Sequence, residues 1–483
     1  MPNIREMQRR LCQWAADHAE GQYRDLFNLI CDYNWLYQAY RNIADNKGAS
    51  TPGVDGLTRI HWDKEIESNM AQLLDDLRMG KYRPQPCRRV YIPKKSGTLR
   101  PLGIPALRDR IVQEAIRMAI EPIFETDFHD YSFGFRPQRS THDAIEQLRF
   151  HLIERKRMYY VIEGDIKGCF DAIHHRKLMQ LLRRRIGDKR VLAIIWSFLK
   201  AGVMEKGLFS PTEQGTPQGG VISPLLSNIY LHELDRFIYS RFQSRHKRER
   251  ERCRNHGGNN ANFVRYADDF VVTCNGHIRD VRQLKEDIAK FLAEELHLTL
   301  SPEKTLITHV NDGFDFLGFH FQRGTSAKGK CCIKTTIPQK NVERVKEKIR
   351  ILTEHDHTYL CEVVIISKIN QLLRGWGNYY RYQCVSETFA ETDHFVFWRL
   401  IQWYRNKHRW SKRETILKRF NQKAGDKRLF AAWDGAEGAR RTYLFILVRD
   451  IKRQRYYRRK KQNPFLVDTL PIEEAIAMES RMR

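Results

Sequence analysis

Apolar side chains recur along much of this chain at the spacing of an α-helix. Residues 1–80 are mainly helical in character. Between residues 109 and 128 the apolar positions are three and four residues apart, which predicts a helix with one long apolar face. From Ser223 to Arg241 we expect another helix, with Ser223 as its N-cap and Pro224 in its first turn.

Short apolar runs in the central part of the chain predict strands instead. Residues 87–102 have the character of a hairpin with its turn at Ser96-Gly97. Residues 159–166 predict a buried strand, and residues 263–272 predict a strand, a tight turn and a second strand. The charged, glycine- and asparagine-rich stretch 244–262 between them predicts a solvated loop.

The character of the chain changes near Pro338. An apolar stripe formed by Val342, Val345, Ile349 and Leu352 is surrounded by lysine and arginine, which predicts an amphipathic helix. From this point to the end we expect helices of increasing basicity. We therefore place a domain boundary near residue 335.

Length and charge narrow the class of protein. A chain of 483 residues can form two or three domains with substantial cores. A net charge of +26 indicates a polyanionic partner, and nucleic acid is the most general one. No apolar run is long enough to span a membrane and no signal peptide is present, so we expect no membrane partner. The ten cysteines form no Cys-x-x-Cys pair, and we expect a reducing cytosol.

Residues 405–461 hold the densest positive charge. They contain twenty lysines and arginines against five acidic residues. Aromatic residues are interleaved with the cations, among them Trp410, Tyr456 and Tyr457. Cations bind phosphates and rings stack on exposed bases, so this mixture favours an RNA-binding surface over a plain solvated face.

Three aspartates are the candidate catalytic residues. Asp268 and Asp269 lie inside an apolar run, where two ionised carboxylates are costly unless a cation meets them. A solvated turn is the alternative for such a pair taken alone. Asp165 ends a separate apolar strand and adds a third carboxylate. Three such groups can hold two Mg²⁺ ions roughly 3.5–4 Å apart, the arrangement for in-line nucleotidyl transfer.

These segments resemble motifs of a known family, the group II intron-encoded reverse transcriptase/maturases of the bacterial type. Tyr266-Ala267-Asp268-Asp269 is similar to its Tyr-x-Asp-Asp box, and the segment around Asp165 resembles its motif A. The other resembling segments are residues 92–95, 99–105 and 131–137 (fingers blocks), 215–226 (motif B), 298–305 (motif D), 314–319, and 369–381 (the maturase-specific domain X).

The resemblance implies an α+β fold of the right-hand polymerase type. It places a helical N-terminal extension at 1–80 and the fingers and ferredoxin-like palm at 81–335. A helical thumb that doubles as the maturase domain follows at 336–404, and a basic nucleic-acid-binding region with a tail at 405–483.

The resemblance also implies roles for single residues. Asp165, Asp268, Asp269 and the carbonyl of Ile166 would be ligands of two Mg²⁺ ions. Contacts to the incoming dNTP would come from Lys94 and Arg100 on the triphosphate, Phe170 under the sugar, Gln218 beside Gly219-Gly220, and Lys304 at the leaving group. Ordinary surface charge, a core phenylalanine and a structural lysine remain the alternatives for these positions.

Further residues are expected to contact RNA or DNA because they occupy matching motifs or the basic region. They are Arg136, Arg139, Arg374, Trp376, Tyr379, Tyr380, Arg381, Arg453, Arg455, Arg458 and Arg459.

The resemblance implies an RNA-directed DNA polymerase that also assists splicing and retrohoming of its intron. Its partners would be group II intron RNA, target DNA and dNTPs, in the bacterial cytosol or nucleoid. The paired cysteines and histidines of an HNH endonuclease do not follow Asn463, so we do not expect cleavage of the second DNA strand. Two alternatives stay open, a splicing factor without polymerase activity and a domesticated or defence-associated reverse transcriptase. The oligomeric state also stays open, with a dimer among the options.

Overall fold

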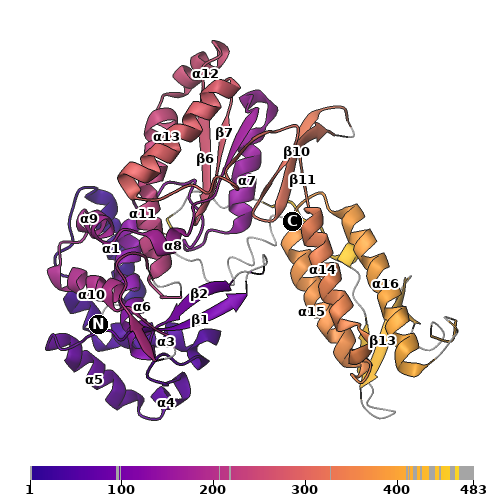
Figure 1. Ribbon diagram of the computed structural model, residues 1–483, viewed down its shortest axis with the longest axis horizontal. Coiled ribbons are helices and arrows are strands. Elements are labelled where there is room, and N and C mark those ends of the chain that lie inside the picture. Colours follow the sequence, from indigo (N-terminus) through magenta and orange to yellow (C-terminus); the bar gives the residue numbers. More distant parts are fainter. Residues whose placement is uncertain are drawn as a thin grey trace. The chain divides into compact units, whose positions relative to one another are not determined.

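A computed structural model describes most of the chain as a mixture of helices and small sheets (Figure 1). The described residues are 3–93, 97, 99–205, 207–216, 219–326, 328–409, 412, 414–416, 421–424, 427–434, 441–444, 448–456 and 463–466. They form two compact units. One consists of the described residues within 1–151, 158–307 and 458–483, and the other of those within 152–157 and 308–457.

The first unit begins with helices that pack on a long buried helix, α6 (Leu107–Phe124). Almost all of α6 is buried, and the Trp35 indole donates to the carbonyl of Ala115 over 2.9 Å. The helical predictions for residues 1–80 and 109–128 are thereby confirmed. The preceding helices are α1 (Ile4–Asp17), α2 (Phe27–Ile30), α3 (Tyr33–Ala44), α4 (Arg59–Asp63) and α5 (Ile66–Arg78), with a 3₁₀ turn at Lys47–Ser50.

A four-stranded sheet with the order β2-β1-β4-β5 follows in this unit. Strands β1 (Cys87–Pro93) and β2 (Leu99–Ile104) pair antiparallel, which confirms the predicted hairpin. Strand β4 (Val203–Glu205) joins β1 in parallel, and β5 (Leu208–Ser210) pairs antiparallel with β4.

The sheet that carries the three aspartates has the order β6-β7-β3-β8. Its strands are β6 (Ala261–Tyr266), β7 (Asp269–Cys274), β3 (Tyr160–Gly164) and β8 (Leu306–His309). Helix α11 (Ser223–Ile238) packs against β6, and α13 (Ile278–Leu296) packs against β3. The other helices between residues 141 and 255 are α7 (Thr141–Leu152), α8 (Cys169–Ala172), α9 (His175–Arg183), α10 (Lys189–Lys200) and α12 (Lys247–Asn255), with 3₁₀ and π turns at Glu154–Lys156 and Tyr239–Gln243.

Two local predictions in this unit are wrong. The stretch expected to be a solvated loop contains helix α12, which a capping box between His246 and Glu249 begins. Helix α11 has Ile222 as its N-cap residue, and Ser223 and Pro224 are already in its first turn. The cap therefore lies one residue earlier than we predicted.

In the second unit, a short antiparallel sheet precedes a group of packed helices. The sheet has the order β11-β10-β9, with β9 (Phe314–Phe316), β10 (Phe319–Thr325) and β11 (Cys331–Thr336). Helix α14 (Gln339–Leu352) packs against both α15 (Glu362–Tyr380) and α16 (Ser386–His408). Buried Val342, Val345 and Ile349 form the predicted apolar stripe of α14.

The expectation of helices up to the end of the chain is wrong in part. Three antiparallel strands follow α16, namely β12 (Asn421–Ala424), β13 (Lys427–Asp434) and β14 (Arg441–Leu444). A 3₁₀ turn at Val448–Asp450 follows them, and another at His355–His357 lies between α14 and α15. Within the described residues no helix is both long and apolar enough to cross a membrane.

Candidate active site

Asp268 and Asp269 lie at the tip of the β6–β7 hairpin. Tyr266 pairs with Asp269, so Ala267 and Asp268 form a two-residue loop. Ala267 has a φ of +59°, in the left-handed region that a side chain disfavours. The tight turn therefore places one aspartate in the loop and the other at the first position of β7.

Asp165 reaches the same tip from strand β3. Strand β3 pairs antiparallel with β7, and its last residue, Gly164, lies opposite Phe270. A Cβ at Gly164 would lie 2.1 Å from the Phe270 ring, so only glycine fits there. Asp165 is the next residue, and this register sets it beside the start of β7, where Asp269 is located.

The segment 299–304 fixes the backbone around Asp165. Ser301 donates its backbone N–H to the Asp165 carbonyl over 2.8 Å, and Ile166 forms an antiparallel bridge with Leu300. Lys304 Nζ lies 3.0 Å from Asp165 Oδ2, although this lysine side chain is 69% exposed. The structure thus brings the lysine predicted at the leaving group to the three carboxylates.

The carboxylates act on one another electrostatically. Withdrawal from water, and then the charges of Asp268 and Asp165, raise the pKa of Asp269 to about 6, while Lys304 opposes the rise. Burial likewise raises the pKa of Asp268, with Asp165 adding to the rise and Arg100 opposing it. Lys304 and Arg100 therefore do not offset the combined effect of burial and of the neighbouring carboxylates on these pKa values.

This donor set fits a hard divalent cation by its chemistry. Carboxylate and carbonyl oxygens are the ligands that Mg²⁺ prefers, and a cation would relieve the mutual repulsion of the aspartates. Across the described ranges, no three His, Cys, Asp or Glu side chains are already grouped closely enough to hold a metal. The site would therefore need small side-chain adjustments, and Lys304 would have to yield its place on Asp165.

The structure also describes Arg100 and Phe170, two of the residues predicted at the dNTP. Arg100 is exposed on β2, close enough to Asp268 to lower its pKa. Phe170 is half-buried in α8, with its ring centre 6.2 Å from that of Phe135 in an edge-on arrangement. Lys94 and Gln218, also predicted at the dNTP, lie outside the described residues.

A backbone clamp joins α8 to the loop before α11. Thr216 donates its N–H to the Phe170 carbonyl and Gly215 donates to the Ile173 carbonyl, each over 2.8 Å. The buried His175 donates from Nε2 to the Gly215 carbonyl over 2.6 Å. Sequence reasoning missed His175, because a single histidine at a helix start carries no signal of its distant partner.

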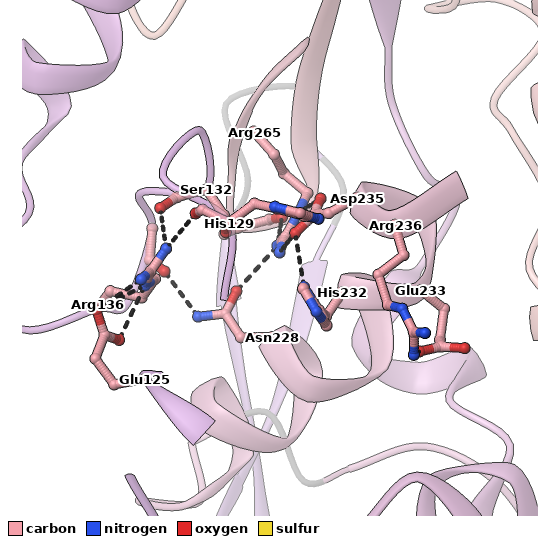
Figure 2. Close-up of polar contacts among 12 residues, drawn as sticks. Glu125, His129, Ser132, Arg136, Asn228, His232, Glu233, Asp235, Arg236 and Arg265 are labelled. Carbon is pink, nitrogen blue, oxygen red and sulfur yellow. Dashed lines mark hydrogen bonds and ion pairs between the residues drawn. The ribbon is translucent and has the colours of Figure 1, made fainter. Parts of the chain in front are cut away.

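A buried polar network beneath the hairpin was also missed. Arg265, fully buried on β6, forms a 2.6 Å ion pair with the equally buried Asp235 of α11. Asn228 lies between Arg265 and Arg136 in Figure 2. Burial alone would raise the pKa of Asp235, but the Arg265 guanidinium outweighs it and holds that pKa well below its usual range. The available signal was an arginine inside the apolar run 263–266, which needs a buried partner.

Arg136, predicted at RNA or DNA, lies in the protein interior. Its guanidinium lies 2.6 Å from Glu125 and donates to two backbone carbonyls, with both side chains only 1% exposed (Figure 2). Arg139 is mostly buried and lies 3.6 Å from carboxylate oxygens of Glu125 and Asp130. Both arginines therefore bind carboxylates and carbonyls of the protein itself, and these contacts stabilise the segment after α6.

Some of the residues predicted from the maturase motif pack inside the protein, and others are exposed. Tyr379 and Tyr380 donate their hydroxyls to the carbonyls of Leu317 and Gly318, over 2.9 and 3.1 Å. Trp376 is half-buried against Tyr380 and Phe389, whereas Arg374 is exposed. Arg381, half-buried, donates to Gln454 over 2.6 Å.

The basic region is described only in part. Arg453 and Arg455 are exposed, and Arg453 donates to the Ser386 hydroxyl over 2.5 Å. Arg458 and Arg459 lie outside the described residues.

Comparison with known proteins agrees with this geometry. Residues 92–321 match the family described as reverse transcriptase (RNA-dependent DNA polymerase), and residues 342–421 match the group II intron maturase-specific domain. Protein YkfC of Escherichia coli (strain K12) is 44% identical over 353 residues, covering 70% of this chain and 93% of that protein. Group II intron-encoded protein LtrA of Lactococcus lactis subsp. cremoris is 32% identical over 479 residues, covering 84% and 78%.

The fold and the site thus define a reverse transcriptase, an RNA-directed DNA polymerase, with a maturase domain after it. Within that class the chain belongs to the group II intron-encoded reverse transcriptase/maturase family.

Proposed function

We propose that Asp165, Asp268 and Asp269 hold two Mg²⁺ ions for transfer of a nucleotide from dNTP to a primer, with the Ile166 carbonyl as a further ligand. The register that sets Asp165 beside the start of β7 carries this proposal. When bound, the ions would stabilise the charge on the phosphate oxygens and lower the pKa of the attacking hydroxyl. The protein's part is to hold the carboxylates at the ends of β3 and β6–β7.

The incoming dNTP would lie between these aspartates and β2. Arg100 would bind the triphosphate through its planar guanidinium, together with Lys94 as a point charge. The ring of Phe170 would lie under the sugar and exclude a 2′-hydroxyl. Gln218, with Gly219-Gly220, would let the backbone approach the dNTP and the template closely. Lys304 would move from Asp165 to the departing pyrophosphate. Its side chain is 69% exposed, so it has room to change its ion-pair partner.

The arrangement supports a right-hand polymerase, with residues 81–335 as fingers and palm and 336–404 as thumb and maturase domain. The intron RNA, and target DNA with it, would bind through exposed cations such as Arg374, Arg453 and Arg455. Because Arg136 and Tyr380 are buried, we leave them out of the proposed contacts. The bacterial cytosol or nucleoid fits a family that includes relatives from two bacteria.

Replacement of Asp268 by asparagine tests the metal role. We expect Asp268→Asn to lower primer extension on an RNA template by about a hundredfold or more, because a ligand charge is lost. Binding of group II intron RNA should stay unchanged in a filter assay. Asp312→Asn, at an exposed aspartate, is the matched control and should extend primers normally. Undiminished extension by Asp268→Asn would overturn the metal assignment.

The same preparations separate the alternatives. A wild-type chain that binds intron RNA without extending primers would be a splicing factor alone. Recovery of an unrelated structured RNA with the purified protein, and of no group II RNA, would support a domesticated or defence-associated enzyme.

A further inference from the structure

The hairpin turn that carries Asp268 is held in a conformation it would not adopt by itself. Ala267 has a φ of +59° although it has a side chain. Such backbone persists only where the surrounding structure over-determines it, and it is typical of functional sites. The contacts that hold Ala267 therefore also decide where the next residue, Asp268, points.

Arg265 supplies the central contact. Its Nη1 donates to the Ala267 carbonyl and to Asn228 Oδ1, each over 2.9 Å. Its Nε and Nη2 donate to the two carboxylate oxygens of Asp235, over 2.7 and 2.6 Å. The planar guanidinium thus binds the Ala267 carbonyl, Asn228 and Asp235 at the same time and links the turn to helix α11. The compact ammonium group of lysine cannot reach all three partners.

Gly134 packs against the backbone of the turn at Ala267. Asn228 donates from Nδ2 to the Gly134 carbonyl over 2.8 Å. A Cβ at Gly134 would lie 2.3 Å from the Ala267 backbone nitrogen, so this glycine is required for space. The segment runs beside β6, since Arg265 donates to Tyr131 and accepts from Phe133 through their backbones.

We propose that Arg265 is a positioning residue for Asp268, acting through the Ala267 carbonyl with Asp235, Asn228 and Gly134 as its supports. Figure 2 shows Arg265 with Asp235 and Asn228. The Arg265 side chain is fully buried, so it is not accessible to a substrate. The inference rests on the proposed metal role of Asp268. Residues that orient metal ligands commonly change metal affinity by about 10–100-fold when they are replaced.

The test measures metal binding without catalysis. The free Mn²⁺ signal in electron paramagnetic resonance reports Mn²⁺ affinity of the full chain without dNTP or nucleic acid. We expect Arg265→Lys to weaken Mn²⁺ binding by about tenfold or more. Lysine keeps the positive charge beside Asp235 but loses the hydrogen bond to the Ala267 carbonyl. Primer extension should then show a lower kcat with an unchanged KM for template-primer.

Arg117→Lys is the matched control, since Arg117 forms partly buried ion pairs with Glu114 and Glu121 of its own helix α6. It should lower the melting temperature without changing Mn²⁺ affinity. Asn228→Ala keeps the pair between Arg265 and Asp235 and loses the link to Gly134. This variant decides the question if Arg265→Lys does not fold, and it should also weaken Mn²⁺ binding.

The outcomes separate this inference from the proposed function. Loss of Mn²⁺ binding in Asp268→Asn, with loss also in the folded Arg265 or Asn228 variant, supports both. Loss in Asp268→Asn with affinities within about twofold of wild type in Arg265→Lys and Asn228→Ala overturns the positioning role alone. Wild-type protein that does not bind Mn²⁺, or Asp268→Asn that binds it normally, overturns the metal site itself.

Discussion

The backbone N–H of Thr216 donates to the carbonyl of Phe170 over 2.8 Å, which joins the loop before α11 to the short helix α8. Gly215 and His175 strengthen the same junction. The position of the Phe170 ring is thus set by two segments about forty-five residues apart in sequence. A ring held in this way can act as a steric limit, because its backbone cannot withdraw from a larger sugar.

Replacement of Phe170 by valine should relax sugar selection. We expect Phe170→Val to raise ribonucleotide incorporation relative to deoxynucleotide incorporation by about tenfold or more. The smaller valine side chain would leave room for the 2′-hydroxyl that the phenylalanine ring excludes. Single-nucleotide extension with each substrate measures the ratio. Phe209→Val, at an exposed phenylalanine on β5, is the control and should leave it unchanged. Equal ratios in wild type and Phe170→Val would refute the role of the ring.

The buried pair between Arg136 and Glu125 should matter for stability. Removal of one partner from a buried ion pair costs about 3–5 kcal/mol, because the other charge is left uncompensated. We expect a loss of this size in the free energy of unfolding of Arg136→Gln by urea denaturation. Arg149→Gln, at a partly exposed pair with Glu146, should cost no more than about 1 kcal/mol. Loss of RNA affinity in Arg136→Gln without loss of stability would instead make Arg136 an RNA contact.

His129 should make the fold sensitive to mild acid. Burial, and then the neighbouring His232, lower the pKa of His129 from 6.5 to about 4. The unfolded chain therefore takes up a proton at a pH where the folded chain does not. This contribution to stability is present above about pH 6.5 and is lost as the pH falls toward about 4.

The variant His129→Phe keeps the ring that stacks on Tyr239 and removes the titration. Between about pH 7 and about pH 5 we expect it to lose about 1 kcal/mol less stability than wild type, after allowance for the partial exposure of His129. Urea denaturation at both pH values measures the difference, with the exposed His256→Gln as control. Identical losses in wild type and His129→Phe would contradict the prediction.

Four arginines of the basic region should contribute to the salt dependence of RNA binding, and two of them, Arg453 and Arg455, are described and exposed. Each phosphate contact that is lost should flatten the slope of log affinity against log salt by about 0.7–0.9. We expect this for Arg453→Gln and Arg455→Gln, and the same for Arg458→Gln and Arg459→Gln. Arg190→Gln is the control, because its charge is already paired with Asp25 and Asp188. An unchanged slope would mean that these arginines only face solvent.

The sequence predicts the parts of the fold whose cause is local. The apolar spacing of α6 and the short apolar runs of β6 and β7 are visible along the chain, and so are the aspartates beside these runs. Helix α12 escaped prediction because its sequence, Lys247–Asn255, has almost no apolar face, and its capping box is the signal we overlooked. Strand β13 contains the short apolar run 429–433, which fits a strand or a helix equally well without its partners.

The contacts between distant segments could not be predicted in this way. Nothing near Arg265 in the sequence indicates that Asp235 and Asn228 surround it, because burial depends on the packing of α11 on β6. Arg136 shows the opposite error. Its place in a motif suggested a surface role, whereas Glu125 and two carbonyls bind its charge in the interior.

The absent side chain at Gly134 has a consequence for recognising functional decay in related sequences. A relative can keep all three aspartates and still lose the turn, if any larger residue replaces this glycine and presses on the alanine before the pair. A check for the three aspartates alone would classify such a chain as having an intact active site. Inspection of the position of Gly134 would identify it as a copy whose hairpin no longer closes.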